Sequence, residues 1–486
     1  MTDPGSHGWL LLIGGELVAS VAGRTYPVEN PATGEVLAHA PDGDAADVDA
    51  AQRAAAHAAP GWARVAPTAR ARLVRALAAV VRSNAEELAL LDTLDLGSPL
   101  PAMRLDVERA AESLELFADL ALQLGGHVVP ATAEHLHFTR RAPYGVVGRI
   151  LPFNHPIMFA AGKIAAPLVA GNTVIVKPAD QTPLSALRMG ELFADVLPPG
   201  VLNIVSGDGP ATGAAIAAHP GIPRIAFIGS EPTGRRIQET AARSAVKQVS
   251  LELGGKNAII VFPDADLDAA ADGAVAGMNF TASTGQSCGS TSRLLVHVDV
   301  AEKVVAAVHD RMARLRTGDP LDPATDVGPL VSRRQHDRVL DHVRGALAEG
   351  ATLALGGGRP AGLDQGHYVE PTLLTGVTPD MRIANDEVFG PVLSVLTFRD
   401  DAEALRIADA VEYGLTASIW TRDVSRAHRL ADAVQVGYVW VNGSSRHFPG
   451  LPYGGWKASG IGQEESVDEL LGFTRTKAIT IYDALV

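Results

Sequence analysis

The single cysteine of this chain, Cys288, is the residue with the most evident chemical potential. It lies within residues 284–290, where small side chains leave a thiol open to an electrophile. A free cysteine has a pKa near about 8.5, so little of it is thiolate at neutral pH unless nearby donors or a helix N-terminus lower that pKa. Cys288 is therefore a candidate nucleophile. The alternative is an inert cysteine that packs as a small hydrophobe.

Two other segments carry groups that a reactive thiol needs. Glu252 precedes two glycines and Lys256, which is the arrangement expected of a general base in a tight cavity. A base of this kind contributes roughly 10²–10⁴-fold to a rate; the alternative is a surface pair between Glu252 and Lys256. Asn154 stands between Pro152 and Pro156, which restrict the backbone and make its amide a preorganised donor. The alternative is an ordinary asparagine in a turn.

Two segments that follow predicted strands could bind a nucleotide. Residues 229–234 join a strand to a helix, so their backbone amides and the helix dipole can face a pyrophosphate. Lys177 and Asp180 come just past another strand and could hold ribose hydroxyls. An ordinary turn and solvated loop charges are the respective alternatives. The Gly-x-Gly-x-x-Gly fingerprint of the standard dinucleotide turn is absent from the sequence.

The surrounding pattern predicts an α/β fold that positions these residues. Residues 44–124 have helical spacing, after which short apolar strands alternate with helices. Such alternation indicates a mainly parallel sheet covered on both faces, with ligands at the carboxyl ends of its strands. The final segment, 474–482, alternates in a way that suits pairing as a strand. The clearest apolar strands are predicted at 173–176, 224–228 and 257–261, and 134–150 also alternates.

Composition excludes several classes of protein. The 486 residues are 47% hydrophobic, which at about 100–200 residues per domain predicts two to four globular domains. A net charge of −14 disfavours nucleic acid and anionic membranes as partners. The most apolar segment, 157–176, is interrupted by polar residues and proline, so we expect no membrane span. One cysteine and no recognisable secretion signal lead us to expect a cytoplasmic protein.

Eight segments in fixed order together resemble the aldehyde dehydrogenase superfamily over nearly the whole chain. They lie at residues 30–35, 152–156, 177–180, 227–230, 252–256, 285–288, 387–392 and 452–460. The resemblance implies two Rossmann-like α/β domains and a small β extension. It places the dinucleotide-binding domain at 1–124 and 143–252, the catalytic domain at 253–457 and the oligomerisation strands at 125–142 and 470–486. Such an extension pairs across subunits, because an unpaired edge strand invites another chain, so we expect a homodimer or homotetramer.

By the same resemblance, Cys288 forms a thiohemiacetal with an aldehyde. The side-chain amide of Asn154 and the backbone N–H of Cys288 hold the oxyanion, and Lys163 joins the catalytic residues. After hydride transfer to a nicotinamide, Glu252 activates the water that hydrolyses the thioester. Family members that pass the acyl group to coenzyme A usually lack this glutamate, so we expect hydrolysis. The reaction needs no metal.

The resemblance also implies the cofactor contacts. NAD is expected, and NADP is possible because Asp180 stands where the family commonly has the longer glutamate. Lys177 and Asp180 match the positions that bind the adenosine ribose, and Glu387 with Phe389 match those that hold the nicotinamide ribose. The full set of matched positions is Pro152, Phe153, Lys177, Asp180, Gly209, Gly229, Ser230, Gly234, Leu253, Glu387 and Phe389.

The positions that match the aldehyde pocket suggest the kind of substrate. Gly162 replaces a side chain that is often a bulky aromatic, which implies open space. Two histidines and few aromatic residues favour a bulky or polar aldehyde over a short alkyl one. The matched positions are His155, Phe159, Gly162, Ser287, Ser445, His447 and Tyr453.

Two other functions fit parts of this pattern. A cysteine-dependent hydrolase could use the same thioester without net oxidation. A non-catalytic protein on the same scaffold would tolerate the loss of Cys288 or Glu252, and their presence disfavours it. His135 and His137, two apart on a predicted strand, are expected to be solvated edge residues and not metal ligands.

Overall fold

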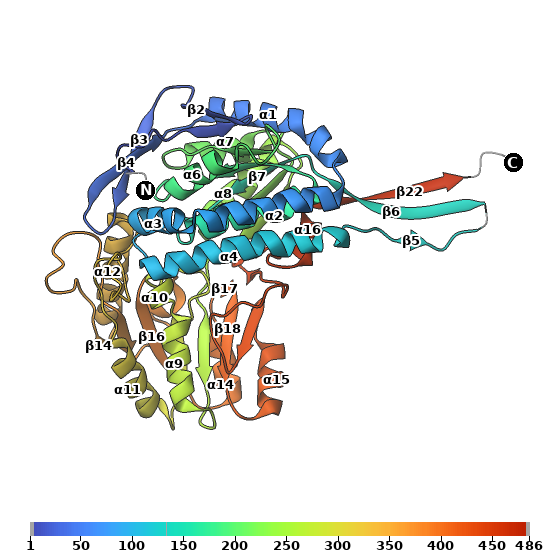
Figure 1. Ribbon diagram of the computed structural model, residues 1–486. Coiled ribbons are helices and arrows are strands. Elements are labelled where there is room, and N and C mark those ends of the chain that lie inside the picture. The colour runs from blue at the N-terminus through green and yellow to red at the C-terminus, as the bar shows by residue number, and fades with distance from the viewer. Residues whose placement is uncertain (1–3, 133, 483–486) are drawn as a thin grey trace.

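The computed structural model describes residues 4–132 and 134–482 and contains two large sheets (Figure 1). The first sheet has eight strands in the order β2-β1-β9-β8-β7-β10-β11-β21. Its central strands are parallel. β1 runs antiparallel to both β2 and β9, and the edge strand β21 runs antiparallel to β11. The strands are β1 (Leu11–Ile13), β2 (Glu16–Val18), β7 (Val146–Ile150), β8 (Thr173–Lys177), β9 (Leu202–Ile204), β10 (Arg224–Ile228), β11 (Gln248–Glu252) and β21 (Gly460–Ile461).

Helices cover this sheet, so every residue of β7, β8 and β10 is buried. Burial on both faces explains why these strands are apolar throughout and do not alternate. The predicted helical region 44–124 forms the first five helical elements. The helices are α1 (Ala45–Arg64), α2 (Pro67–Ser83), α3 (Ala85–Leu96), α4 (Leu100–Asp119), η1 (Leu120–Gln123), α5 (Pro156–Ala170), α6 (Leu184–Phe193), α7 (Ala211–Ala218), α8 (Glu231–Ser244) and α16 (Val467–Gly472).

The second sheet has seven strands in the order β14-β15-β16-β13-β12-β18-β19, all parallel except the edge pair β14–β15. It lies below the first sheet in Figure 1. Its strands are β12 (Ala258–Val261), β13 (Arg293–His297), β14 (Thr352–Leu355), β15 (Thr372–Thr375), β16 (Val392–Phe398), β18 (Thr416–Trp420) and β19 (Tyr438–Val441). Its helices are α9 (Leu267–Gly277), α10 (Phe280–Ser283), α11 (Ala301–Met312), α12 (Arg333–Ala348), α13 (Arg382–Asn385), α14 (Asp401–Asp409) and α15 (Val424–Ala433).

A three-stranded arm extends away from both sheets (Figure 1). It consists of β5 (Val128–Val129), β6 (His135–Pro143) and β22 (Thr474–Tyr482), and β6 pairs with β22 along its full length. Residues 1–3, 133 and 483–486, which fall within the expected domain and arm segments, lie outside the described residues. Two two-stranded antiparallel sheets complete the described fold: β3 (Thr25–Asn30) with β4 (Glu35–Pro41), and β17 (Tyr413–Gly414) with β20 (Trp456–Lys457).

The predicted α/β class is confirmed, and so are the predicted strands. The three apolar runs correspond to β8, β10 and β12, and the alternating tail is β22. Within the described residues, no helix combines the length and hydrophobicity that crossing a bilayer requires.

Candidate active site

The candidate active site forms where the carboxyl edge of the first sheet meets the amino edge of the second. Glu252 is the last residue of β11, and Asn154 lies between β7 and α5. Cys288, in contrast, lies in the loop that leads into β13. In the first sheet β8 and β10 lie on opposite sides of β7, so the order of the strands reverses at β7. Open α/β sheets bind ligands at such a switch point.

Two glycines after Glu252 let three chain segments converge. A Cβ atom on Gly254 would lie 2.2 Å from Oε2 of Glu387, and one on Gly255 would lie 2.7 Å from the carbonyl oxygen of Cys288. The backbone N–H of Gly255 donates to Oε1 of Glu387 at 2.9 Å. No side chain fits at either glycine, so the approach of Glu387 and of the Cys288 loop depends on them.

Cys288 is half-buried as a residue, and its Sγ lies 3.9 Å from Oη of Tyr453. Burial raises the pKa of the thiol well above its ordinary value, and the negative charge of Glu252 raises it further. The sequence left open whether neighbours would lower this pKa, and the structure shows the opposite shift. The group is a thiol at neutral pH and needs a base to become a nucleophile.

The carboxyl group of Glu252 is suited to be that base. The residue is 6% exposed, and burial, followed by the charge of Glu464, raises its pKa to about 8. A hydrogen bond with the thiol of Cys288 opposes this shift. Its Oε1 is buried and has no hydrogen-bond partner among the described residues. A carboxylate whose pKa lies near neutrality can both accept and release a proton during a reaction cycle.

A buried ion-pair network lies near Glu252, and of its members only Lys163 was predicted from the sequence. Nζ of Lys163 lies 2.8 Å from Oε2 of Glu464, whose Oε1 lies 3.1 Å from Nη1 of Arg149. Nη2 of Arg149 lies 2.5 Å from Oε1 of Glu469. The cations lower the pKa of Glu464 to about 2 although burial opposes them, and Glu464 raises the pKa of Lys163. The catalytic role of Lys163 stays a prediction.

We expect Glu464→Gln to lower the free energy of unfolding by about 3–5 kcal/mol at pH 7, because it leaves Lys163 and Arg149 buried with one carboxylate fewer. The folded pKa of Glu464 is depressed, so its contribution is complete above the ordinary carboxyl pKa and is lost as pH falls toward 2. Urea denaturation followed by circular dichroism at pH 7 and pH 3 measures this difference.

The exposed pair of Arg104 with Glu86 supplies the control for this measurement. Glu86→Gln should barely move the urea midpoint, because exposed ion pairs contribute little. Equal midpoints for Glu464→Gln and the wild type would contradict a stabilising role for the network.

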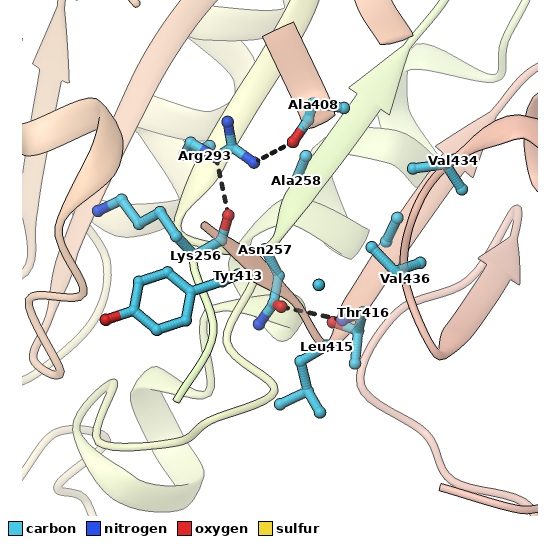
Figure 2. A pocket seen from close by; sticks show the side chains of 12 residues that line it. Lys256, Asn257, Ala258, Arg293, Ala408, Tyr413, Leu415, Thr416, Val434 and Val436 are labelled. Atoms are coloured by element: carbon cyan, nitrogen blue, oxygen red, sulfur yellow. Dashed lines mark hydrogen bonds between the residues drawn. The ribbon is translucent and has the colours of Figure 1, made fainter. Parts of the chain in front are cut away.

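Asn257 fixes the nucleophile loop, and it was not among the predicted site residues. Its Nδ2 donates to the carbonyl oxygens of Cys288 at 2.7 Å and Ser290 at 3.0 Å. Its Oδ1 accepts from the backbone N–H of Thr416 at 3.0 Å, as Figure 2 shows. The residue is 3% exposed. A polar residue directly before the apolar strand at 258–261 was the only signal for it in the sequence.

The cavity in Figure 2 lies behind this loop and is bordered by Lys256, Asn257 and Arg293, but not by Cys288 or Glu252. Nζ of Lys256 is buried without a hydrogen-bond partner among the described residues, and burial lowers its pKa to about 7. In the part of the chain that the structure describes, Lys256 and Glu252 form no ion pair. The alternative of a surface pair between them is therefore wrong.

The residues expected to hold the adenosine end of NAD lie together. Oδ2 of Asp180 accepts from the backbone N–H of Gly209 at 3.3 Å. Lys177, 6% exposed, lies close enough for the charge of Asp180 to raise its pKa, although burial lowers that pKa overall. A buried ammonium beside a carboxylate is suited to bind vicinal hydroxyls.

The turn expected to face the pyrophosphate opens α8. Ser230 is the N-cap, and its hydroxyl donates to the hydroxyl of Thr233 and accepts no hydrogen bond from a backbone N–H of the helix. The N–H of Gly229 donates to the carbonyl of Glu252 at 3.1 Å. A Cβ on Gly234 would lie 2.9 Å from Leu253, so α8 begins directly against the segment after Glu252. This geometry suits an anion at the helix N-terminus.

The residues expected near the nicotinamide also converge. The rings of Phe153 and Phe389 are perpendicular, with centroids 5.6 Å apart, and Phe389 has a positive φ of 58°. Burial raises the pKa of Glu387 to about 7, although the hydrogen bond from the backbone N–H of Gly255 lowers it. Pro152 is half-buried beside Phe153. These residues therefore fit a dinucleotide cofactor.

Part of the expected aldehyde pocket lies on α5. Nδ1 of His155 lies 2.6 Å from Oδ2 of Asp106, a buried residue of α4 that the sequence analysis did not select. The ring of His155 is perpendicular to that of Phe159, with centroids 5.7 Å apart. Nζ of Lys163 lies 5.9 Å from the Phe159 centroid.

The expectation of open space at Gly162 is wrong. A Cβ there would lie 3.2 Å from Oγ of Ser113 on α4, and that hydroxyl donates to the carbonyl of Gly162 at 3.4 Å. The glycine allows α4 and α5 to pack closely, and α4 fills the volume that an aromatic side chain would take.

The remaining expected pocket positions lie in loops next to strands of the second sheet. The ring of His447 stacks on Tyr453 at 4.4 Å, and its Nδ1 lies 2.9 Å from Oε2 of Glu465. The hydroxyl of Ser445 donates to Oδ1 of Asn279 at 2.6 Å and is thereby engaged in the fold.

Ser287, the last of these positions, is partly exposed beside Cys288. Across the described ranges, no group of three or more metal-ligating side chains is placed to hold an ion. His135 and His137 lie on β6, with ring centroids 6.1 Å apart.

Known proteins resemble this chain along nearly its whole length. The model of the Aldehyde dehydrogenase family matches residues 18–479. Aldehyde dehydrogenase tropH of Talaromyces stipitatus is 45% identical over 461 residues, which cover 93% of this chain and 89% of that protein. Human retinal dehydrogenase 2 is 40% identical over 477 residues, covering 97% and 91%.

Solved structures agree in fold. One of them is PnpE, a protein of Pseudomonas sp. WBC-3, solved in complex with nicotinamide adenine dinucleotide. It matches this chain with a TM-score of 0.96 and 40% identity, and the match covers 99% of each chain. An NAD+ complex of aldehyde dehydrogenase from Bacillus cereus has a TM-score of 0.95 and 38% identity and covers 98% of this chain and 97% of that one. The resemblance first indicated by eight ordered motifs is thereby confirmed: the chain belongs to the aldehyde dehydrogenase family.

Proposed function

We propose that this enzyme oxidises an aldehyde to a carboxylic acid with NAD, through a thiohemiacetal and a thioester on Cys288 that water then hydrolyses. The observation that carries this proposal is that Cys288 and Glu252 lie close enough for each to shift the pKa of the other, and the pKa of Glu252 is about 8. The pKa of each group is raised above its ordinary value. The carboxylate can accept the proton that the thiol must lose to become a nucleophile.

In the first step, Glu252 takes the thiol proton and the sulfur attacks the aldehyde carbon. The resulting oxyanion is held by the side-chain amide of Asn154 and the backbone N–H of Cys288. Neither donor has a hydrogen-bond partner among the described residues, so both are available to the oxyanion. Loss of one such donor typically costs about 10²–10³-fold in turnover.

NAD, when bound, would accept the hydride that leaves the oxyanion carbon. Cys288 then holds the acyl group as a thioester on its sulfur. Glu252 then removes a proton from water, which attacks the thioester and releases the acid. Its unpartnered Oε1 is free to accept that proton. A small cavity bordered by Glu252, Tyr453 and Glu464 adjoins it. The balance is aldehyde, NAD+ and water to acid, NADH and a proton.

We assign the adenosine ribose to Lys177 and Asp180, the pyrophosphate to the turn from Gly229 to Gly234, and the nicotinamide ribose to Glu387 and Phe389. NAD should be preferred over NADP, because the carboxylate of Asp180 would repel a 2′-phosphate. The proposed domains remain 1–124 with 143–252 for the dinucleotide and 253–457 for catalysis.

The direct test is NADH formation, measured at 340 nm with NAD or NADP and a panel of acetaldehyde, aromatic aldehydes and aminoaldehydes. We expect absorbance to rise with NAD and with a bulky or polar aldehyde. Ester cleavage without NADH formation would favour the cysteine-dependent hydrolase instead. A protein with neither activity would fit the non-catalytic alternative.

A homodimer or homotetramer is proposed from the three-stranded arm of β5, β6 and β22, with 125–142 and 470–486 as the proposed oligomerisation segments. Val128, Leu136, Ile481 and Tyr482 are 75%, 45%, 51% and 66% exposed on it. Apolar side chains on an open sheet favour pairing with another copy. Light scattering at micromolar concentration should give a multiple of 50.7 kDa, and a monomeric mass would contradict this proposal. A cytoplasmic location is proposed because the sequence has a single cysteine.

A further inference from the structure

His155 and Asp106 form a buried pair that the steps proposed above do not use. Nδ1 of His155 lies 2.6 Å from Oδ2 of Asp106, and the two residues are 8% and 1% exposed. His155 follows Asn154 directly in the sequence and is the N-cap residue of α5. The pair therefore stands immediately beside the proposed oxyanion donor.

The contact fixes which ring nitrogen carries the proton. Nη1 of Arg109 lies 3.3 Å from Oδ1 of Asp106, so the carboxylate pairs with a cation through one oxygen and with the ring through the other. A carboxylate only accepts hydrogen bonds, so Nδ1 of His155 must donate to it. In the neutral ring, Nε2 is then left as an acceptor, in the same way that a carboxylate orients a catalytic histidine.

Nε2 of His155 remains available for a ligand. It has no hydrogen-bond partner among the described residues, and it is not among the polar atoms that are fully sealed from solvent. A series of contacts connects the ring to the reacting groups: Phe159 packs against His155, Lys163 approaches Phe159, and Glu464 pairs with Lys163 and acts on Glu252.

We propose that His155 is a specificity-determining residue whose Nε2 accepts a hydrogen bond from a hydroxyl group of the substrate, and that Asp106 is the positioning residue that keeps Nε2 an acceptor. The preferred substrates are hydroxylated aldehydes. This inference rests on the proposed aldehyde oxidation and names its substrate class. An aldehyde without a donor would displace water from Nε2 and leave a buried acceptor unpaired, which sites of this kind discriminate against strongly.

The test compares aldehydes of nearly equal shape that differ in hydrogen bonding. For the wild type, kcat/KM is measured by NADH formation with 3- and 4-hydroxybenzaldehyde, the corresponding methylbenzaldehydes and the corresponding methoxybenzaldehydes. We expect at least one hydroxyl isomer to exceed its methyl counterpart by about tenfold or more. The methoxy compounds, which cannot donate, should gain nothing over the methyl compounds.

Two variants attribute this preference to the pair. His155→Phe keeps an aromatic ring without the acceptor, and the hydroxyl-to-methyl ratio should fall to near one. In Asp106→Asn, the amide can donate to Nδ1 and turn Nε2 into a donor. The methoxy-to-methyl ratio should then rise, which general damage to the fold would not produce. Arg104→Gln, on the same helix but in a surface pair with Glu86, should keep the wild-type ratios.

The outcomes separate this inference from the proposed function. If the wild type forms NADH from none of these aldehydes or those of the wider panel, aldehyde oxidation itself is wrong. If NADH forms but hydroxyl and methyl compounds react equally, or if His155→Phe retains the preference, aldehyde oxidation stands and the role of His155 is overturned. A stronger preference for 4-carboxybenzaldehyde that is lost in Arg109→Gln would also overturn it, because Arg109 would then be the recognition residue.

Discussion

Replacing Cys288 with alanine should lower the rate of NADH formation by at least about 10⁴-fold, because no other residue can form the covalent bond to the aldehyde carbon. The chain has no second cysteine that could substitute. The loss should appear in kcat, since the pocket and the proposed cofactor residues are unchanged. Initial rates at 340 nm with saturating NAD and aldehyde measure it.

Thr281→Ala is the matched control for this variant. Thr281 lies exposed on α10, in the segment just before the nucleophile loop, and its hydroxyl has no assigned role. Far-UV circular dichroism and NAD binding by fluorescence quenching should be the same for both variants and the wild type. Oxidation of aldehyde by Cys288→Ala at a rate near that of the wild type would remove the basis of the proposed mechanism.

Glu252→Gln should slow deacylation more than acylation, so that the thioester accumulates. At alkaline pH solvent hydroxide can also deprotonate the thiol, whereas the attack of water on the thioester depends on the positioned carboxylate. The amide keeps the shape of the side chain but cannot take a proton from water, and turnover should fall by about 10²–10⁴-fold. Intact-protein mass spectrometry after mixing with NAD and aldehyde should show one added acyl group. Treatment with hydroxylamine should remove it, because hydroxylamine cleaves thioesters.

The pH profile gives an independent measure of the same residue. The deprotonated carboxylate is the active base, so with a pKa of about 8 the deacylation rate should rise with pH up to about 8 and then level off. In Glu252→Gln this rise should disappear. Glu239→Gln, in an exposed pair with Arg243 on α8, should retain the wild-type profile. A Glu252→Gln enzyme with full turnover, no bound acyl group and an unchanged profile would assign the base to another residue.

The elements of the fold were predictable where local pattern determines them. The buried strands β8, β10 and β12 are continuous apolar runs because both faces of their sheets are covered. β22 has an alternating sequence, and on the arm it is exposed along most of its length. The types of the reacting groups were also accessible from the sequence, since a thiol, a carboxylate and an amide are needed for the chemistry wherever they stand in the chain.

The contacts that orient these groups were not predictable. Asp106 reaches His155 and Asn257 reaches Cys288 from segments that are distant in the sequence, and Glu464 meets Lys163 from near the other end of the chain. None of these residues stands out locally, because a buried polar residue looks the same in sequence as an exposed one. Gly162 illustrates the converse error: an absent side chain suggested space, but α4 occupies that space.

The sequence by itself determined which residues could react and on which strands or loops they lie, because secondary structure and side-chain chemistry depend on local composition. Only the tertiary structure decided how they act. It brings the carboxyl edge of one sheet against the amino edge of the other, and the resulting burial shifts the pKa of Glu252 to about 8 and that of Cys288 upward. Protonation and orientation depend on neighbours contributed by the whole chain, since desolvation and charge act through space and not along the sequence.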